Sequence, residues 1–165
     1  MPTPEDDEYT SNLTKDVLSA AIHQHLGISL ISQSPYHAVI QVTTGSEHMT
    51  PSSTLHGGIT TLLLDSVCFL ALIPTLSAGQ SAATAASSFQ LMNPVAGLGK
   101  VVRFGGKVVR RGGSVAFCEG EAILELSRAS CKEYLGIQAV VYIDNAELEA
   151  VTKLLEARNT RDVST

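Results

Sequence analysis

One carboxylate stands apart in the middle of this chain. Between Glu47 and Lys100 the sequence holds a single Asp, Glu, Lys or Arg, which is Asp65 in a long apolar run. Burying a carboxylate costs several kcal/mol unless a neighbouring group compensates it. Chains keep such a residue mainly where its charge is used, so we interpret Asp65 as part of a catalytic centre.

The segment before Asp65 suits the binding of a carbonyl oxygen. Gly57 and Gly58 follow His56 and open the apolar stretch, which the pattern predicts as a helix. A helix N-terminus presents unpaired backbone N–H groups and about half a positive charge, and glycines let a ligand approach the backbone closely. This suits an acyl carbonyl that becomes an oxyanion, as in thioester cleavage. We expect His56 to bond the loop or to shield that carbonyl.

The spacing of these residues predicts a site shared between subunits. Gly57 and Asp65 are eight residues apart, which is about 12 Å along a helix. An aspartate side chain is too short to reach a carbonyl held at Gly57 of its own helix. Two antiparallel helices side by side would place each Asp65 opposite the partner's Gly57. The composition, 44% hydrophobic and 16% charged, also favours an extra buried surface between subunits.

The remaining pattern predicts one domain built around the apolar helix. That helix, residues 57–73, is apolar on nearly every face and must therefore be surrounded. An antiparallel sheet curled around it is the economical solution. We expect a disordered leader at 1–12, a domain at 13–143 that begins with a helix to about residue 25, and a C-terminal helical extension at 144–165 with its helix at 146–158. The predicted strands are 28–32, 36–44, 82–92, 100–110, 114–126 and 132–142.

Glycines mark two further features of the predicted strands. Gly105-Gly106 indicates a bulge or bend, and Arg111-Gly112-Gly113 indicates a tight hairpin turn.

The motif Leu55-His56-Gly57-Gly58, followed by Asp65 and by Met92-Asn93-Pro94, resembles the hotdog-fold acyl-CoA thioesterases of the phenylacetate-pathway (PaaI-type) group, in the 4-hydroxybenzoyl-CoA thioesterase superfamily. The resemblance covers residues 20–143. It implies an α+β fold, with an antiparallel sheet of five to six strands wrapped around one long central helix and extra N- and C-terminal helices. It also implies dimers that pair their sheets edge to edge.

The resemblance also implies roles for individual residues. Asp65 would be the general base or nucleophile, and the N–H of Gly57 would polarise the thioester carbonyl, with His56 and Gly58 beside it. Thr84, on the strand after the helix, would position water. No metal or redox cofactor is implied; coenzyme A or phosphopantetheine enters as part of the substrate.

Two positions depart from that pattern. The family usually has an asparagine six residues before the histidine and a glycine three before it, where this chain has Thr50 and Ser53. Either Thr50 or a neighbouring hydroxyl substitutes, or hydrolysis gives way to another acyl chemistry. The alternatives to a thioesterase are therefore a dehydratase, isomerase or cyclase acting on an acyl or polyketide intermediate, and a non-catalytic acyl-binding module.

Charge and cysteine content limit the possible partners and the cellular compartment. The net charge of −5 argues against nucleic acid as a partner, and the apolar run is a poor membrane span because it holds Asp65 and Pro74. The three cysteines form no disulfide framework, and without a signal peptide we expect a soluble cytoplasmic homodimer or dimer of dimers. Basic residues within one short stretch are either a solvated strand edge or a dock for coenzyme A phosphates or an acyl carrier protein: Lys100, Arg103, Lys107, Arg110 and Arg111.

Other chemistries have weaker support in the sequence. His23, His25, His37 and His48 show no metal-ligand spacing, and Cys68 is better explained by packing than by nucleophilic attack. No Gly-x-Ser-x-Gly motif is present for a serine hydrolase. We expect an acyl pocket lined by small and apolar residues such as Ala82, Ala83, Phe89 and Leu91.

Overall fold

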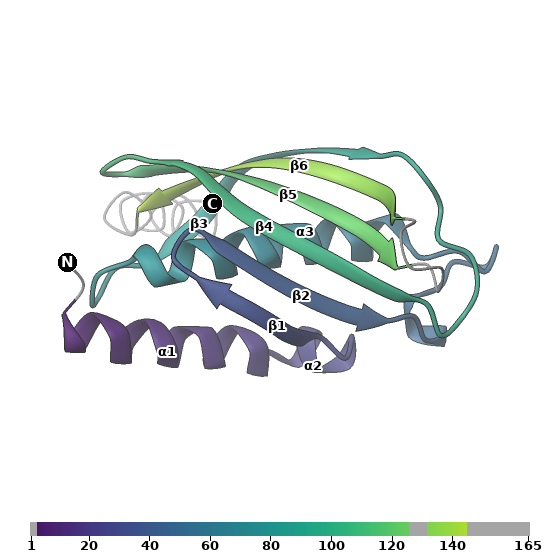
Figure 1. Ribbon diagram of the computed structural model, residues 1–165, viewed down its shortest axis with the longest axis horizontal. Helices are drawn as coiled ribbons and strands as arrows, with labels where there is room; N and C mark the ends of the chain where they lie inside the picture. The colour runs from purple at the N-terminus through teal and green to yellow at the C-terminus, as the bar shows by residue number, and fades with distance from the viewer. Residues whose placement is uncertain (1–2, 126–131, 145–165) are drawn as a thin grey trace, which may run out of the picture.

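The computed structural model describes residues 3–125 and 132–144, and these form one antiparallel sheet curved around one long helix (Figure 1). The strand order is β1-β2-β4-β5-β6-β3. This confirms the predicted α+β hotdog architecture. The helices are α1 (Pro4–Ser19), α2 (Ala21–His25) and α3 (Gly57–Leu72), with short 3₁₀ turns η1 (Ser46–His48) and η2 (Ile73–Thr75), and the strands are β1 (Ser29–Ser34), β2 (His37–Thr43), β3 (Ala82–Leu91), β4 (Val101–Arg111), β5 (Val115–Glu125) and β6 (Lys132–Asp144).

Alternation along the strands builds the core. In β2, β4 and β5 every second residue is buried against α3, while the residues between them face solvent. The helix contributes Leu63, Leu64, Val67 and Cys68, each fully buried. Together with η2 it forms the stretch Gly57–Thr75, which by length and composition alone could cross a membrane. Its place as the core helix of this fold explains that composition.

Two paired glycines let α3 lie close to the sheet. Gly106 of β4 pairs with Gly120 of β5. A Cβ on Gly106 would lie 2.4 Å from the backbone oxygen of Val67, and one on Gly120 would lie 3.1 Å from Cys68 Sγ. Glycine in the strand therefore marks a close backbone approach. The bulge predicted at Gly105-Gly106 is wrong, because both residues pair in register there.

The irregularity in β4 lies further along the strand. The β4–β5 register shifts between Val108 and Arg110. The predicted hairpin turn is confirmed, with the N–H of Gly112 donating to the backbone oxygen of Val115 at 2.7 Å.

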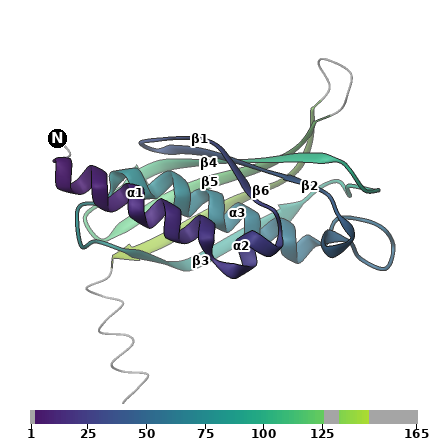
Figure 2. The same ribbon diagram turned by 90° about the horizontal axis from the view of Figure 1, so that it is seen from below.

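The disordered leader expected at 1–12 is wrong for residues 3–12, since α1 begins at Pro4. Thr3 caps this helix in a capping box with Asp6. Tertiary contacts also hold it, because Tyr9 Oη donates to the backbone oxygen of Gln80 at 2.6 Å and Asp6 Oδ1 accepts the N–H of Ala78. Figure 2 shows α1 and α2 along the side of α3 that the sheet leaves open. The C-terminal helix predicted at 146–158 lies outside the described residues.

Candidate active site

The loop before α3 ends in a cap that leaves one backbone donor open. His56 is the N-cap residue, and its Nδ1 accepts the N–H of Gly58 at 2.9 Å. The backbone oxygen of His56 accepts the N–H groups of Ile59 and Thr60. Among the described residues, no group accepts the N–H of Gly57, the first residue of the helix. This donor lies at the positive end of the helix dipole and is available to a ligand oxygen.

Gly57 lines a cavity of about 330 Å³ between the loop at 50–55, the first turn of α3 and the end of β3. A Cβ on Gly57 would lie 2.8 Å from Leu91 Cδ1. The absence of a side chain therefore keeps this N–H accessible beside a tightly packed neighbour. Thr50, Thr54 and Asn93 also line the cavity.

Two threonine hydroxyls stand where the resemblance leads one to expect an amide. Thr50 Oγ1 and Thr54 Oγ1 lie 2.8 Å apart. Two hydroxyls carry two hydrogens, and the bond between them uses one, so the pair can donate one further hydrogen bond. Because both residues line the cavity of Gly57, that donor and the open N–H can serve the same ligand.

The second departure from the family pattern has a conformational consequence. Ser53 has φ +57°, in the left-handed region that favours glycine. Its N–H closes the turn by donating to the backbone oxygen of Thr50 at 2.9 Å. The turn thus keeps its shape with a serine, at a cost in backbone strain.

Asp65 lies at the middle of α3 and is half-buried. Thr84 of β3 donates from its Oγ1 to Asp65 Oδ1 at 2.8 Å. A hydroxyl bonded to one carboxylate oxygen fixes the orientation of the group. The structure thus brings together two of the residues that the sequence singled out.

A second cavity of about 330 Å³ surrounds Asp65. It is bounded by α3, by β3 and by the two N-terminal helices. Gly57 does not line it, and Asp65 does not line the cavity at Gly57. Within one protomer, the N–H of Gly57 and the carboxylate of Asp65 therefore open into different cavities. The residues around Asp65 are Val17, Ala20, His23, Ser66, Phe69, Ala82 and Thr84.

The cysteines in the described residues are unsuited to nucleophilic attack. Cys68 and Cys118 are both free and buried. Burial raises the pKa of Cys68 far above its usual range, with the neighbouring Cys118 thiol adding to the effect. Burial, and then the charge of Asp65, raise the pKa of Cys118 to about 12. Neither forms a thiolate near neutral pH, which supports the interpretation of Cys68 as a packing residue.

The basic residues do not gather in one place. They are spread along β4, whose eleven residues span about 35 Å. Arg103 Nη1 pairs with Glu125 at 2.8 Å, and Lys107 pairs in register with Glu119 on the exposed face of the sheet. Arg110 is exposed, and Lys100 is exposed at the end of the loop that follows β3.

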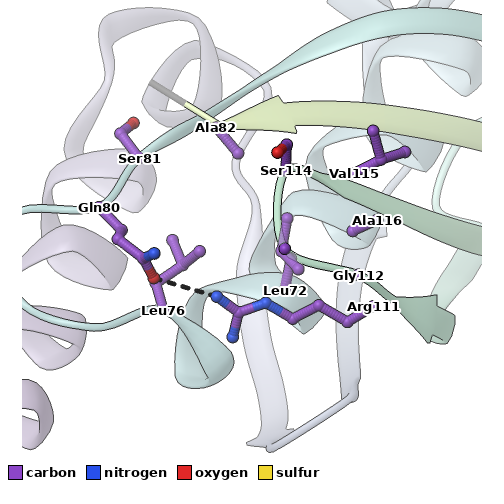
Figure 3. Close-up of a pocket in the computed structure, with 11 residues that line it drawn as sticks. Leu72, Leu76, Gln80, Ser81, Ala82, Arg111, Gly112, Ser114, Val115 and Ala116 are labelled. Carbon is purple, nitrogen blue, oxygen red and sulfur yellow. Dashed lines mark hydrogen bonds between the residues drawn. The ribbon is translucent and has the colours of Figure 1, made fainter. Parts of the chain in front are cut away.

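Arg111 lies at the opposite end of β4 from Lys100. Its Nη2 donates to Gln80 Oε1 at 3.0 Å across a small cavity (Figure 3). Ala82 lines both this cavity and the one at Asp65. Arg111 is therefore the basic residue of this stretch that lies near the Asp65 cavity.

The histidines have separate structural surroundings. His48 is buried, with its Nδ1 accepting the N–H of Gly45 and its Nε2 donating to the backbone oxygen of Leu26. His37 and His25 are exposed. Among the described residues, no three His, Cys, Asp or Glu side chains converge as metal ligands.

Comparison with known proteins links the central part of the chain to one family. The model of the thioesterase superfamily matches residues 52–131, which include His56, Gly57, Asp65 and Thr84. Residues 52–131 thus match the thioesterase superfamily, and the fold is the hotdog fold. No curated protein matches it closely enough to be counted as a relative.

Solved structures share this hotdog fold at low sequence identity. A thioesterase family protein from Silicibacter pomeroyi is 17% identical with a TM-score of 0.73, covering 82% of this chain and 97% of its own. The PaaI protein of the phenylacetic acid degradation operon of E. coli is also 17% identical, with a TM-score of 0.69 and coverage of 84% and 92%. Thioesterase superfamily member 2 from Mus musculus is 19% identical, with a TM-score of 0.66 and coverage of 80% and 94%.

Sequence reasoning missed several polar residues of these cavities in the thioesterase fold. Thr54 was not singled out, although its spacing from Thr50 in a Pro-Ser-Ser turn could have indicated it. His23 and Ser66 are 43 residues apart and meet only in the tertiary structure, with His23 Nε2 2.9 Å from Ser66 Oγ. No local pattern signals that contact. Of the expected acyl-pocket residues, Ala82 lines the Asp65 cavity and Leu91 the Gly57 cavity.

Proposed function

We propose that this protein hydrolyses an acyl thioester of coenzyme A or of an acyl carrier protein to a free acid and a thiol. The observation that carries the proposal is the hydrogen bond from Thr84 to Asp65, together with the open N–H of Gly57. Asp65 is an oriented base, and the N–H of Gly57 is a fixed hydrogen-bond donor to the substrate carbonyl. Thioester hydrolysis needs both.

The reaction follows from the charges that develop. Asp65 takes a proton from a water whose oxygen attacks the carbonyl carbon, or it attacks that carbon itself. The carbonyl oxygen becomes an oxyanion and accepts the N–H of Gly57 and the spare hydroxyl hydrogen of the Thr50–Thr54 pair. Collapse of the tetrahedral intermediate breaks the C–S bond, and the thiolate leaves with the proton that Asp65 had taken. In the direct-attack route the thiolate leaves as Asp65 forms a mixed anhydride, and the water that then hydrolyses the anhydride supplies the proton of the thiol.

A homodimer completes the site, because the two groups open into different cavities of one protomer. One stripe of α3 is left partly exposed, at the spacing of a helix face that packs against another helix: Gly58, Thr61, Leu62, Asp65 and Phe69. In addition, β3 is at the edge of the sheet and is largely exposed. A second copy that covers this stripe antiparallel would bring the partner's Gly57 to Asp65.

The same proposal includes a phosphate-bearing thiol carrier and a cytoplasmic location for the protein. Arg111, near the Asp65 cavity, is suited to a phosphate of coenzyme A or phosphopantetheine, while the other basic residues of β4 are solvated or paired. Two buried free thiols fit a reducing cytoplasm.

The test is hydrolysis of a panel of acyl-CoA thioesters, followed as free thiol, with wild type and Asp65→Asn side by side. We expect Asp65→Asn to lower kcat/KM by about 10³-fold, as general-base loss does, with unchanged assembly and melting temperature. A matched control is Asp16→Asn on the exposed face of α1. Near-normal turnover by Asp65→Asn would reject the role of this residue. Conversion of the acyl group with no thiol released would indicate a dehydratase, isomerase or cyclase instead.

A further inference from the structure

The cavity of Asp65 has a wall that the thioesterase match does not include. Residues 52–131 supply α3 and β3, but the N-terminal helices supply Val17, Ala20 and His23. These helices lie outside the matched segment. The family match therefore says nothing about what these three residues do in the cavity.

The wall is apolar where it faces Phe69 and Ala82 across the cavity. Val17 and Ala20 are partly exposed aliphatic residues. They are spaced three apart on α1 and its C-cap, so they lie on one face of the helix. Aliphatic and aromatic side chains around a single carboxylate make a site for an apolar group next to a reacting centre.

A change of chain direction at Ala20 sets this wall in place. Ala20 has φ −54° and ψ 136°, outside the helical region, and it separates α1 from α2. The break turns His23 back so that its Nδ1 lies 2.6 Å from the backbone oxygen of Val17. Because a carbonyl oxygen only accepts, Nδ1 carries the hydrogen.

His23 then connects the wall to the turn of α3 that carries Asp65. Its Nε2 lies 2.9 Å from Ser66 Oγ, whose one hydrogen can be donated either to this nitrogen or to the backbone oxygen of Leu62, also at 2.9 Å. Both ring nitrogens are used by protein groups, so the ring presents no polar atom to a ligand. Its contacts instead tie α1 and α2 to the residue next to Asp65.

We propose that the α1–α2 pair is the acyl-binding wall of the site, with Val17 and Ala20 contacting an apolar acyl group and His23 as the positioning residue that holds the wall against α3. This inference rests on the proposed function, since it names the part of that site that selects the acyl group. His23 acts through Ser66 and does not touch the reacting atoms.

The first test enlarges the wall. Ala20→Leu should lower kcat/KM for hexanoyl-CoA about tenfold, the effect of one or two methylenes in an apolar pocket, and should leave acetyl-CoA within about twofold. Ser19→Leu is the matched control, because Ser19 is exposed beside it and does not line the cavity. Equal losses on both substrates, or no loss on either, would overturn the assignment of the wall.

The second test concerns His23. We expect His23→Ala to lower kcat/KM for hexanoyl-CoA about tenfold and His23→Gln, whose amide has a donor for Val17 and an acceptor for Ser66, to restore most of it. Ser66→Ala should have a similar effect, and the double variant should lose no more than either single one, because both remove the same connection. His25→Ala is the control on the exposed side of α2. Additive losses, or no rescue by glutamine, would overturn the positioning role.

A binding measurement separates this inference from the proposed function. Calorimetry with a non-hydrolysable ketone analogue of hexanoyl-CoA reports on the wall without turnover. If wild type hydrolyses no thioester but Ala20→Leu weakens binding of the analogue, the proposed function fails and the acyl wall stands. If wild type hydrolyses thioesters and neither variant changes selectivity or binding, the wall is wrong and the proposed function stands.

Discussion

The two cavities of α3 differ in how they are built. At the N-terminus of the helix, the donor at Gly57 is set by residues within a few positions, through the cap of His56 and the turn at Thr50 and Ser53. At the middle of the helix, Asp65 is surrounded by residues from α1, α2 and β3. Local hydrogen bonds set the donor of the first region, whose cavity also includes the end of β3, whereas tertiary packing sets the surroundings of Asp65 in the second. Substitutions in the loop should therefore act mainly on the donor at Gly57, whereas the position of Asp65 depends on how α1, α2 and β3 pack together.

The strongest test asks whether the two regions meet between subunits. Asp65→Asn and Gly57→Val protomers should each be inactive alone, the second because the new side chain meets Leu91 and covers the N–H. In a hybrid dimer, one of the two sites keeps both native groups. Mixing after partial denaturation and refolding should thus restore activity from below about 1% to a substantial fraction of wild type, measured as thiol release. Mixtures that stay inactive while hybrids form would exclude a shared site.

A stability measurement addresses the packing that places Asp65. Gly106→Ala puts a Cβ against the backbone of Val67, which is unable to move aside, and should lower the free energy of unfolding by about 3 kcal/mol. Gly105→Ala is the matched control, because its Cβ points the other way and finds Glu121 Cγ at 3.5 Å. Urea denaturation of both variants makes the comparison. Equal stabilities would show that the helix is not seated on this glycine.

A smaller effect is expected at the hydroxyl pair of the first region. Thr50→Val removes one hydroxyl and leaves Thr54 to donate alone, so kcat should fall about tenfold, the scale of one weakened oxyanion donor. The effect should be on kcat more than on KM, since the bond strengthens as the oxyanion forms. Ser52→Ala, on the exposed part of the same turn, is the control. An unchanged kcat would remove the pair from the site.

The smallest change relieves strain in the same turn. Ser53→Gly should stabilise the protein by up to about 1 kcal/mol, because glycine adopts the positive φ of this position without a steric cost. Thermal denaturation followed by circular dichroism measures the shift. A lower melting temperature would show that the serine hydroxyl contributes more than the strain costs.

Sequence-based prediction succeeded for features set by neighbouring residues and failed for features set by tertiary packing. The strands and α3 were predicted within a few residues, because alternation in β4 and the all-apolar helix are local signals. Thr84 and Asp65 were both selected, and they are bonded to one another. The leader was misjudged because residues 5–8 are acidic or polar, and the capping box and the contacts of Tyr9 with Gln80 outweigh that composition. The predicted bulge at Gly105-Gly106 failed since a glycine in a strand also serves close packing.

The sequence by itself determined the core helix, the carboxylate within it and the open donor at its start, because an apolar run, a single charge within it and paired glycines are properties of neighbouring residues. Only the tertiary structure decided that Gly57 and Asp65 open into different cavities, and that His23 meets Ser66 across 43 positions. The physical reason is that such contacts depend on how a sheet curves and how a helix pair turns at Ala20. Those are outcomes of packing many side chains at once, which leave no pattern in any short stretch of the chain.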